Sequence, residues 1–224
     1  MPDKPVLVKD DDGLSLVRGD LRLRGDLTGM RPRIRKANLR GELLVKASGI
    51  REGSGPARAV DATAGLGEDA FLLAAAGFDV TLFERDPLIA ELLEDAIKRA
   101  VLDPDLAEAA RRMHLRQGDS IEGLAELDAR PDLIYLDPMF PAKKKSSLTG
   151  KKMQLFRMLE NPCPDEEALF QAALGACPTR IIVKRPLKGP HLAGRKPTFA
   201  LSGKSVRFDV YQLTVPDTEV VHVP

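Results

Sequence analysis

The sequence predicts an α/β fold in which strands and helices alternate along the chain and build a mostly parallel sheet. Three observations support this prediction. Residues 58–61 form a short apolar strand, and a turn containing Gly65 and Gly67 leads from it into a helical pattern over residues 68–77. Residues 79–84 then form a second strand that ends in an acid. A strand, a glycine turn and a helix N-terminus in this order are typical of a nucleotide-type cofactor site.

The glycine turn and the acid after the second strand suit a bound nucleotide. Gly65 and Gly67 permit a tight turn with positive φ and a close approach of the backbone to a ligand. Glu84 lies 19 positions after Gly65, and an acid at this distance binds the ribose hydroxyls in doubly wound folds. The competing interpretation is an ordinary turn between helix and strand with a surface acid. The ordered succession of turn, helix, strand and acid favours the cofactor site.

Further strands continue the alternation toward the C-terminus. They are predicted over residues 113–116, 132–136 and 179–183, with helical patterns between them. Two more runs, over residues 199–201 and 206–213, indicate a hairpin that closes the domain.

Two polar residues, Asp119 and Ser120, follow the third strand much as Glu84 follows the second. In a cofactor site, Asp119 can accept a hydrogen bond from an adenine amino group, and Ser120 adds a further polar contact. The competing interpretation is helix capping, because either side chain suits the N-cap of a helix that begins near Ile121. Both roles are compatible with each other.

The loop after the fourth strand carries the candidate chemistry. It reads Asp137, Pro138, Met139, Phe140 and Pro141, and its prolines stiffen a segment at the carboxyl end of a central strand. The Asp137 carboxylate and the Pro138 carbonyl can accept both hydrogens of an exocyclic amino group, and Phe140 can stack on the base that bears it. The competing interpretation is a proline-rich turn with a buried phenylalanine.

Two basic segments are candidates for contacts with a polyanion. Lys143, Lys144 and Lys145 follow the loop above, and a solvated charged loop is the competing interpretation. A second basic stretch, over residues 31–40, belongs to an N-terminal arm that we place at residues 1–45, ahead of a cofactor-binding domain over residues 46–224. That stretch suits either a solvated arm that covers the sheet edge or an arm that contacts phosphates, and both interpretations stay open.

Composition limits the classes of protein that fit. The chain has 224 residues, 43% of them hydrophobic, which allows one domain with or without a small appendage. Its net charge of +1 gives no overall attraction to nucleic acid or membrane. The two cysteines, Cys163 and Cys177, match no metal-ligand spacing. With no apolar run of about 20 residues and no signal-peptide pattern, we expect a cytoplasmic protein that binds neither metal nor membrane.

Four motifs carry a resemblance to a known family. They are residues 61–71 (DATAGLGEDAF), 83–87 (FERDP), 135–141 (YLDPMFP) and 183–186 (VKRP). Together they resemble the bacterial ribosomal RNA small subunit methyltransferase J family, one of the class I methyltransferases that use S-adenosylmethionine. The likeness covers about residues 38–186. It implies a Rossmann-like class I methyltransferase fold, with a seven-stranded, mostly parallel sheet, a C-terminal β-hairpin and a small N-terminal β-containing arm.

The resemblance also implies an activity and a cofactor pocket. The activity is methylation of the exocyclic N2 of one guanine in 16S ribosomal RNA, with S-adenosylmethionine as cofactor and that RNA or the small ribosomal subunit as partner. Glu68 stands where the family often has arginine, so the resemblance favours a backbone role over a side-chain role at this position. The residues expected to bind the cofactor are Asp61, Gly65, Gly67, Glu68, Asp69, Glu84, Arg85, Asp119, Ser120 and Asp137.

A mechanism follows as a hypothesis. Asp137 and the Pro138 carbonyl accept the N–H bonds of the target nitrogen and direct its lone pair at the methyl group. Phe140 holds the face of the base after the base leaves its stack. Either Asp137 or water takes the proton, and the sequence leaves both open. The candidates for contacts with the RNA backbone are Lys143, Lys144, Lys145, Lys184 and Arg185.

Three other functions compete with this interpretation. A nicotinamide-dependent oxidoreductase fits Gly65, Gly67 and Ala70 as a G-x-G-x-x-A fingerprint, but no Tyr–Lys or His pair supplies its catalysis. A methyltransferase of another exocyclic amine, adenine N6 or a protein amide, also fits the loop after the fourth strand. A non-enzymatic RNA-binding module explains the basic segments and leaves the glycine turn and the acids without a role.

Overall fold

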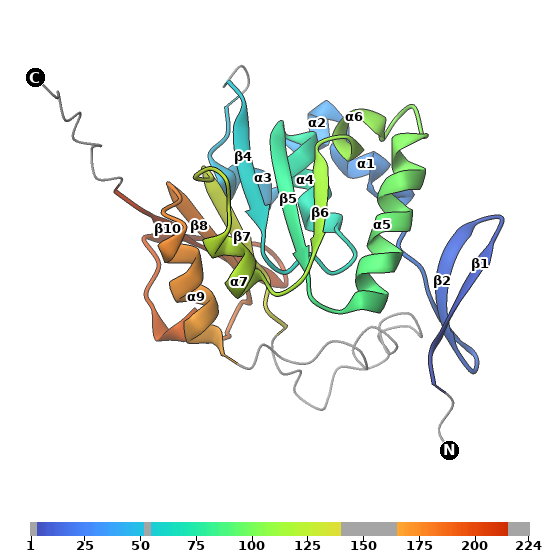
Figure 1. The fold of residues 1–224 in the computed structure, drawn as a ribbon. Coiled ribbons are helices and arrows are strands. Elements are labelled where there is room, and N and C mark those ends of the chain that lie inside the picture. Colours follow the sequence, from blue (N-terminus) through green and yellow to red (C-terminus); the bar gives the residue numbers. More distant parts are fainter. Residues whose placement is uncertain (1–3, 52–54, 140–164, 215–224) are drawn as a thin grey trace, which may run out of the picture.

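The computed structural model describes residues 4–51, 55–139 and 165–214. A seven-stranded sheet runs through its centre, with the strands in the order β6-β5-β4-β7-β8-β10-β9 (Figure 1). The strands of this sheet are β4 (Ala57–Asp61), β5 (Phe78–Glu84), β6 (Met113–Gln117), β7 (Leu133–Leu136), β8 (Arg180–Pro186), β9 (Phe199–Ser202) and β10 (Val206–Gln212).

The sheet is parallel from β6 to β8 and antiparallel where β10 pairs with β8 and β9. Because helices connect the parallel strands, the carboxyl ends of these strands meet at one edge of the sheet. The predicted fold, a mostly parallel sheet of seven strands with a C-terminal hairpin, is confirmed. Between the parallel strands, the described part of the chain contains the helices α4 (Glu68–Ala75), α5 (Pro87–Val101), α6 (Ala107–Ala110), α7 (Ser120–Ala125) and α9 (Glu166–Gly175).

Helices cover both faces of the parallel strands. The helices α3 (Leu43–Ser48), α4 and α5 lie on one face and α7 and α9 on the other (Figure 1). Apolar side chains of the first group form one core cluster, and those of the second group form another. All four residues of β7 are buried, as is typical of a central parallel strand. Polar groups therefore gather where the strands end, which is where the candidate site residues lie.

The N-terminal segment forms a small sheet of its own. β1 (Val6–Asp10), β2 (Gly13–Arg18) and β3 (Leu21–Leu23) pair in the order β1-β2-β3. Leu16 of β2 and Leu23 of β3 pack on α5, which fixes this small sheet against the larger unit. β1 is not predicted from the sequence, because its residues VLVKD show no alternation of apolar and polar residues; all five are exposed.

After this sheet the chain joins the main core. Short helices follow, and Leu27, Met30 and Leu44 belong to the same apolar cluster as α4 and β5. The arm thus shares a core with the larger unit, and the boundary placed at residue 45 stays a prediction. The short helices are η1 (Thr28–Met30), α1 (Arg31–Ile34) and α2 (Lys36–Leu39).

The turn between β4 and α4 depends on glycine. Gly67 precedes the first residue of α4 with a φ of 80°, a conformation that side-chain-bearing residues rarely adopt. A Cβ atom at this position would lie 2.6 Å from Cδ1 of Leu93 in α5. The glycine is therefore required both by the backbone conformation and by the close packing of α5 behind the turn.

Within the described ranges, no helix is long and apolar enough to cross a membrane. The same ranges contain no cluster of three or more His, Cys, Asp and Glu side chains arranged to hold a metal ion.

Replacing Gly67 with alanine should destabilise the protein. A non-glycine residue with positive φ costs about 1–3 kcal/mol, and the contact with Leu93 adds to that cost. Urea unfolding of Gly67→Ala measures the loss. Gly175→Ala is the matched control, because Gly175 lies at the end of α9 with no heavy atom within 4 Å of an added Cβ. The control should be neutral or stabilised by up to about 1 kcal/mol, and equal stability of both variants would contradict this account of the turn.

Candidate active site

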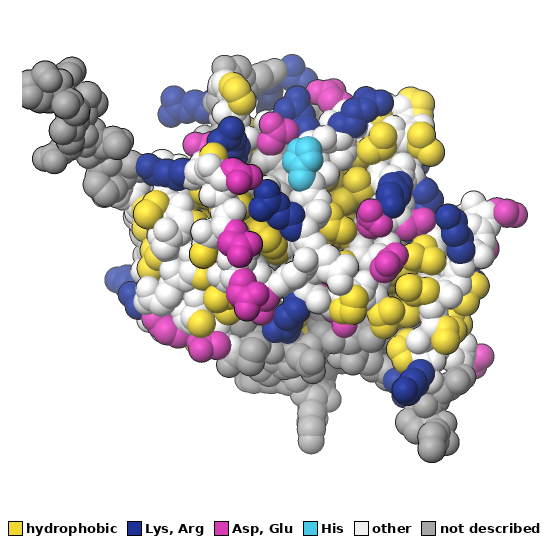
Figure 2. Space-filling model, viewed as in Figure 1, with side chains coloured by type: hydrophobic (Ala, Val, Ile, Leu, Met, Phe, Trp, Pro, Cys, Tyr) yellow, Lys and Arg dark blue, Asp and Glu magenta, His cyan; other side chains and the backbone are white. Residues whose placement is uncertain are grey.

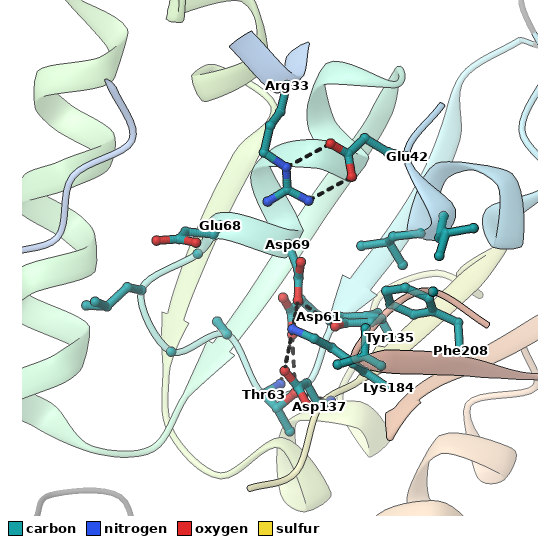
Figure 3. A pocket seen from close by; sticks show the side chains of 18 of the residues that line it. Arg33, Glu42, Asp61, Thr63, Glu68, Asp69, Tyr135, Asp137, Lys184 and Phe208 are labelled. Carbon is teal, nitrogen blue, oxygen red and sulfur yellow. Dashed lines mark hydrogen bonds and ion pairs between the residues drawn. The ribbon is translucent and has the colours of Figure 1, made fainter. Parts of the chain in front are cut away.

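A cavity of about 900 Å³ opens at the carboxyl ends of β4 and β7, and we call it the central cavity (Figure 3). One wall is the turn after β4 with the start of α4, and another comes from the N-terminal helices and the β9–β10 turn. The glycine turn and the loop after β7 therefore open into one shared space. The sequence-predicted site residues that line it are Asp61, Gly65, Gly67, Glu68, Asp69, Asp137 and Lys184.

Thr63 joins the ends of β4 and β7. Its backbone N–H donates to Oδ1 of Asp61 over 3.0 Å, and its hydroxyl oxygen accepts the backbone N–H of Asp137 over 2.6 Å. Asp61 ends β4, and Asp137 directly follows β7, the neighbouring parallel strand. The two acids therefore lie side by side at the sheet edge, and each is bonded to Thr63 in the turn after β4.

A lysine from β8 connects the acids of the cavity (Figure 3). Nζ of Lys184 lies 2.7 Å from Oδ2 of Asp69 and 2.9 Å from Oδ2 of Asp137. The hydroxyl of Tyr135 donates to the same Asp69 oxygen over 2.6 Å. Three elements, α4, β7 and β8, thus contribute to one continuous network of charge-assisted hydrogen bonds.

Burial raises the pKa values of several acidic groups in and beside this network. Burial, with smaller contributions from the Asp69 and Asp137 carboxylates, raises the pKa of Asp61 to about 8. Burial also raises the pKa of Asp137, while the Lys184 ammonium opposes that rise. Burial and the neighbouring acids raise the pKa of Tyr135 well above its usual value. The cavity therefore holds more carboxyl groups than its cations neutralise, and it favours a ligand that carries positive charge.

Glu84 holds the glycine turn in place through hydrogen bonds to backbone N–H groups. Its carboxylate accepts the backbone N–H of Gly65 and the backbone N–H of Asp86, each over 2.8 Å. Burial raises the pKa of this carboxyl, and the two backbone bonds oppose the rise. The spacing of Glu84 after Gly65 thus corresponds to a direct contact, and its bond to a ribose stays a prediction.

The other residues predicted after β5 and β6 lie outside the lining of the central cavity. Arg85 is exposed at the end of β5, and Ser120 is buried in the first turn of α7. Asp119 is the N-cap of α7, and its carboxylate accepts the backbone N–H of Ile121 over 2.9 Å. The capping interpretation is therefore confirmed, and a cofactor role for these three residues stays a prediction.

The two cations of β8 that are expected to contact RNA both form ion pairs within the protein. β8 extends to Pro186, beyond the predicted end of this strand at residue 183, so Lys184 and Arg185 lie within it and point to opposite faces. Lys184 points into the cavity. The Arg185 side chain is 0% exposed and binds Glu166 of α9 over 3.0 Å, so we withdraw it as an RNA contact. Phe140, Lys143, Lys144 and Lys145 lie outside the described residues.

Several residues that line the central cavity are not predicted from the sequence. Arg33 of α1 makes two bonds of 2.8 Å to Glu42, and both side chains border the cavity (Figure 3). Phe208 of β10 also borders the cavity. Such residues come from segments distant in the chain, and neither spacing nor periodicity brings them together. Tyr135 and Thr63 lie inside the recognised motifs, where a polar side chain among buried residues is the available signal.

The fold and the site together define a class I methyltransferase. A family model described as "Putative SAM-dependent methyltransferase" matches residues 6–213. A crystal structure of a SAM-dependent methyltransferase from Neisseria gonorrhoeae is similar over 100% of this chain and 88% of that chain, with a TM-score of 0.76 and 36% identity. The protein is therefore an S-adenosylmethionine-dependent methyltransferase.

Two curated relatives narrow the class. A ribosomal RNA small subunit methyltransferase J from Thioalkalivibrio sulfidiphilus is 44% identical over 214 residues, which is 92% of this chain and 84% of the relative. One from Aeromonas hydrophila is 50% identical over 173 residues, which is 77% of this chain and 69% of the relative. The chain belongs to the ribosomal RNA small subunit methyltransferase J family.

The residues of the central cavity fit this cofactor. A sulfonium centre carries a positive charge, and Asp61, Asp69 and Asp137 supply carboxyl groups around the space with one ammonium, Lys184, between two of them. The amino group of the cofactor adds a second cationic centre that suits the same acids. The charge of the cavity and the charge of the cofactor therefore complement each other.

The buried Asp61 carboxyl should make stability depend on pH. The folded protein keeps the Asp61 proton up to about pH 8, whereas the unfolded chain releases it near 3.8. This contribution is present at low pH and is lost as the pH rises toward 8, by at most about 1.4 kcal/mol per pH unit. Asp61→Asn retains the acceptor oxygen for Thr63 and cannot titrate.

Urea unfolding of the wild type and of Asp61→Asn, at about pH 6 and pH 8, measures this dependence. We expect the stability difference to shift in favour of the variant by up to about 3 kcal/mol at the higher pH. Parallel pH dependence in the two proteins would show that Asp61 is ionised throughout this range in the folded state.

Proposed function

We propose that the protein transfers a methyl group from S-adenosylmethionine to the exocyclic N2 of a guanine in 16S ribosomal RNA. The observation that carries this proposal is the position of Asp137, which borders the same cavity as the glycine turn (Figure 3). The names of the relatives from Thioalkalivibrio sulfidiphilus and Aeromonas hydrophila supply the class of substrate. The proposed partner is 16S ribosomal RNA or the small ribosomal subunit, and the proposed location is the cytoplasm.

Positioning is the main contribution of the chain to catalysis. Bound S-adenosylmethionine supplies an activated methyl group on a sulfonium centre. The turn at Gly65 and Gly67 lets the backbone approach the cofactor closely, and Glu84 holds that turn in place through the Gly65 N–H. The acids that border the cavity offset the positive charge of the cofactor. The proposed cofactor contacts are Asp61, Gly65, Gly67, Glu68, Asp69, Glu84, Arg85, Asp119, Ser120 and Asp137.

The acceptor nitrogen needs activation, because its lone pair is delocalised into the purine ring. We assign the acceptance of its N–H bonds to the Asp137 carboxylate and the Pro138 carbonyl, which orients the lone pair toward the methyl group. The same contacts stabilise the positive charge that develops on nitrogen. Phe140 is the proposed stacking partner of the base, and Lys143, Lys144 and Lys145 are the proposed phosphate contacts.

Asp137→Ala should separate cofactor binding from methyl transfer. The affinity for S-adenosylhomocysteine, measured by calorimetry, should fall far less than the rate of methyl transfer, because the other proposed cofactor contacts remain. Tritium transfer to small-subunit RNA should fall by about 10²–10⁴-fold in kcat/KM, because the variant loses the acceptor of the N–H bond. Asp20→Ala, at an exposed turn between β2 and β3, is the control and should retain full activity. Retained turnover in Asp137→Ala would refute the assigned role.

Mapping of the modified base identifies the substrate. Mass mapping of 16S ribosomal RNA from cells that lack this protein should reveal the loss of one N2-methylguanine, and incubation with the purified protein should restore it. Loss of a methyl group from adenine N6, or from a protein amide, would instead identify that group as the acceptor of the same reaction. Intact methylation in those cells would overturn the proposed substrate.

A further inference from the structure

Lys184 lies in β8 with its side chain on the cavity side of the sheet. In the β8–β10 ladder it pairs with Phe208, which also borders the central cavity. The adjacent Arg185 points to the opposite face and binds Glu166. Alternation along the strand therefore selects Lys184 as the residue of this pair that reaches the acids around the methyl-transfer site.

The ammonium group of Lys184 has two specific partners. Its distances of 2.7 Å to Asp69 and 2.9 Å to Asp137 are those of charge-assisted hydrogen bonds. The Lys184 side chain is 26% exposed and the Asp137 side chain is 38% exposed, so solvent screens this pair only partly. In this geometry the ammonium binds carboxylates inside the cavity and is poorly placed to bind an RNA phosphate.

Lys184 is equally unsuited to accept a proton. The Asp69 and Asp137 carboxylates raise the pKa of Lys184 above its usual value, against the effect of burial. The group thus stays protonated at neutral pH and cannot act as a general base. Its chemical effect on the reaction must pass through the carboxylates it contacts.

We propose that Lys184 is a positioning residue that fixes the Asp137 carboxylate in one orientation and holds it in the ionised form that accepts a hydrogen bond from the substrate amine. This inference rests on the proposed role of Asp137 in methyl transfer. Asp69 contributes to this positioning, because it binds the Lys184 ammonium and is itself held by a hydrogen bond from the Tyr135 hydroxyl.

The groups around Asp137 explain why a cation is needed there. Removal of the ammonium leaves Asp137 partly buried beside other carboxyl groups, and both conditions favour its neutral form. A neutral carboxyl group donates a hydrogen bond where the mechanism needs an acceptor. The charged and titratable groups that act on Asp137 from the cavity side are Asp61, Asp69, Tyr135 and Lys184, and Arg185 acts on it electrostatically from the opposite face of β8.

The test compares Lys184→Met with Lys184→Arg. Carbon-13 NMR of aspartate-labelled protein follows the carboxyl titrations, and the spectrum of Asp137→Asn assigns the signal of Asp137. In Lys184→Met, the pKa of Asp137 should rise by about 1–3 units, and Lys184→Arg should stay close to the wild type. Lys188→Met is the matched control, because Lys188 is exposed beyond the end of β8 and outside the cavity lining.

Activity provides the second measurement. In single-turnover methyl transfer, rate falls at low pH as Asp137 becomes protonated, so a higher pKa moves the acid limb toward neutral pH. Lys184→Met should show this displacement and a loss of at least about tenfold in rate near pH 7. The affinity for S-adenosylhomocysteine should fall far less, and Lys184→Arg should recover most of the rate.

A second variant protects the test against misfolding of Lys184→Met. Asp69→Asn removes a like charge near Asp137 and one of the two partners of Lys184, so the pKa of Asp137 should fall below its wild-type value. An unchanged pKa of Asp137 in both variants would overturn the inference. Absence of RNA methylation by the wild-type protein would instead overturn the proposed function, and the NMR result on Lys184 would still stand.

Discussion

The loop that follows β4 is bonded to both neighbouring strands, and the site depends on this constraint. The Ala62 N–H donates to the Tyr135 carbonyl of β7, and the Ala64 N–H donates to the Phe83 carbonyl of β5, each over 3.0 Å. The Gly65 N–H then binds the Glu84 carboxylate. These bonds leave the loop no freedom to move away from the sheet edge, so the start of α4 and the loop after β7 face one cavity.

The distribution of charge in that cavity suits a cationic cofactor. Asp69 and Asp137 border the space together with Asp61, and Lys184 offsets part of the charge of Asp69 and Asp137. A cationic cofactor and a neutral base are both compatible with an acidic interior, whereas RNA phosphates are repelled by it. The proposed function depends on this arrangement, because a base with an exocyclic amine must enter the cavity while the nucleic acid backbone stays outside.

Sequence reasoning succeeds where local pattern determines structure. The apolar periodicities locate β4, β5, β6, β7 and their helices, and the 19-residue spacing from Gly65 to Glu84 corresponds to a hydrogen bond of 2.8 Å. The dual interpretation of Asp119 is also informative. Its role as the N-cap of α7 is visible in the structure, and that role follows from local sequence alone.

Sequence reasoning fails where distant segments meet. Lys184 and Arg185 are adjacent in a basic motif, but the extension of β8 by pairing with β10 sends them to opposite faces of the sheet. The Arg33–Glu42 pair and Phe208 reach the cavity only because the N-terminal helices and the closing hairpin pack on the same face. Their positions depend on tertiary packing, for which a single sequence carries no periodic signal.

We propose that the glycine turn and Asp137 serve one reaction in one cavity. A crystal structure of the complex with S-adenosylhomocysteine tests this claim most directly. We expect the thioether sulfur to face the Asp137 carboxylate across a gap that a purine amino group can enter. In that gap the amine nitrogen would lie about 3–3.5 Å from the methyl carbon of the intact cofactor, the distance required for transfer. A sulfur atom directed away from Asp137, with protein atoms filling the space between them, would contradict it.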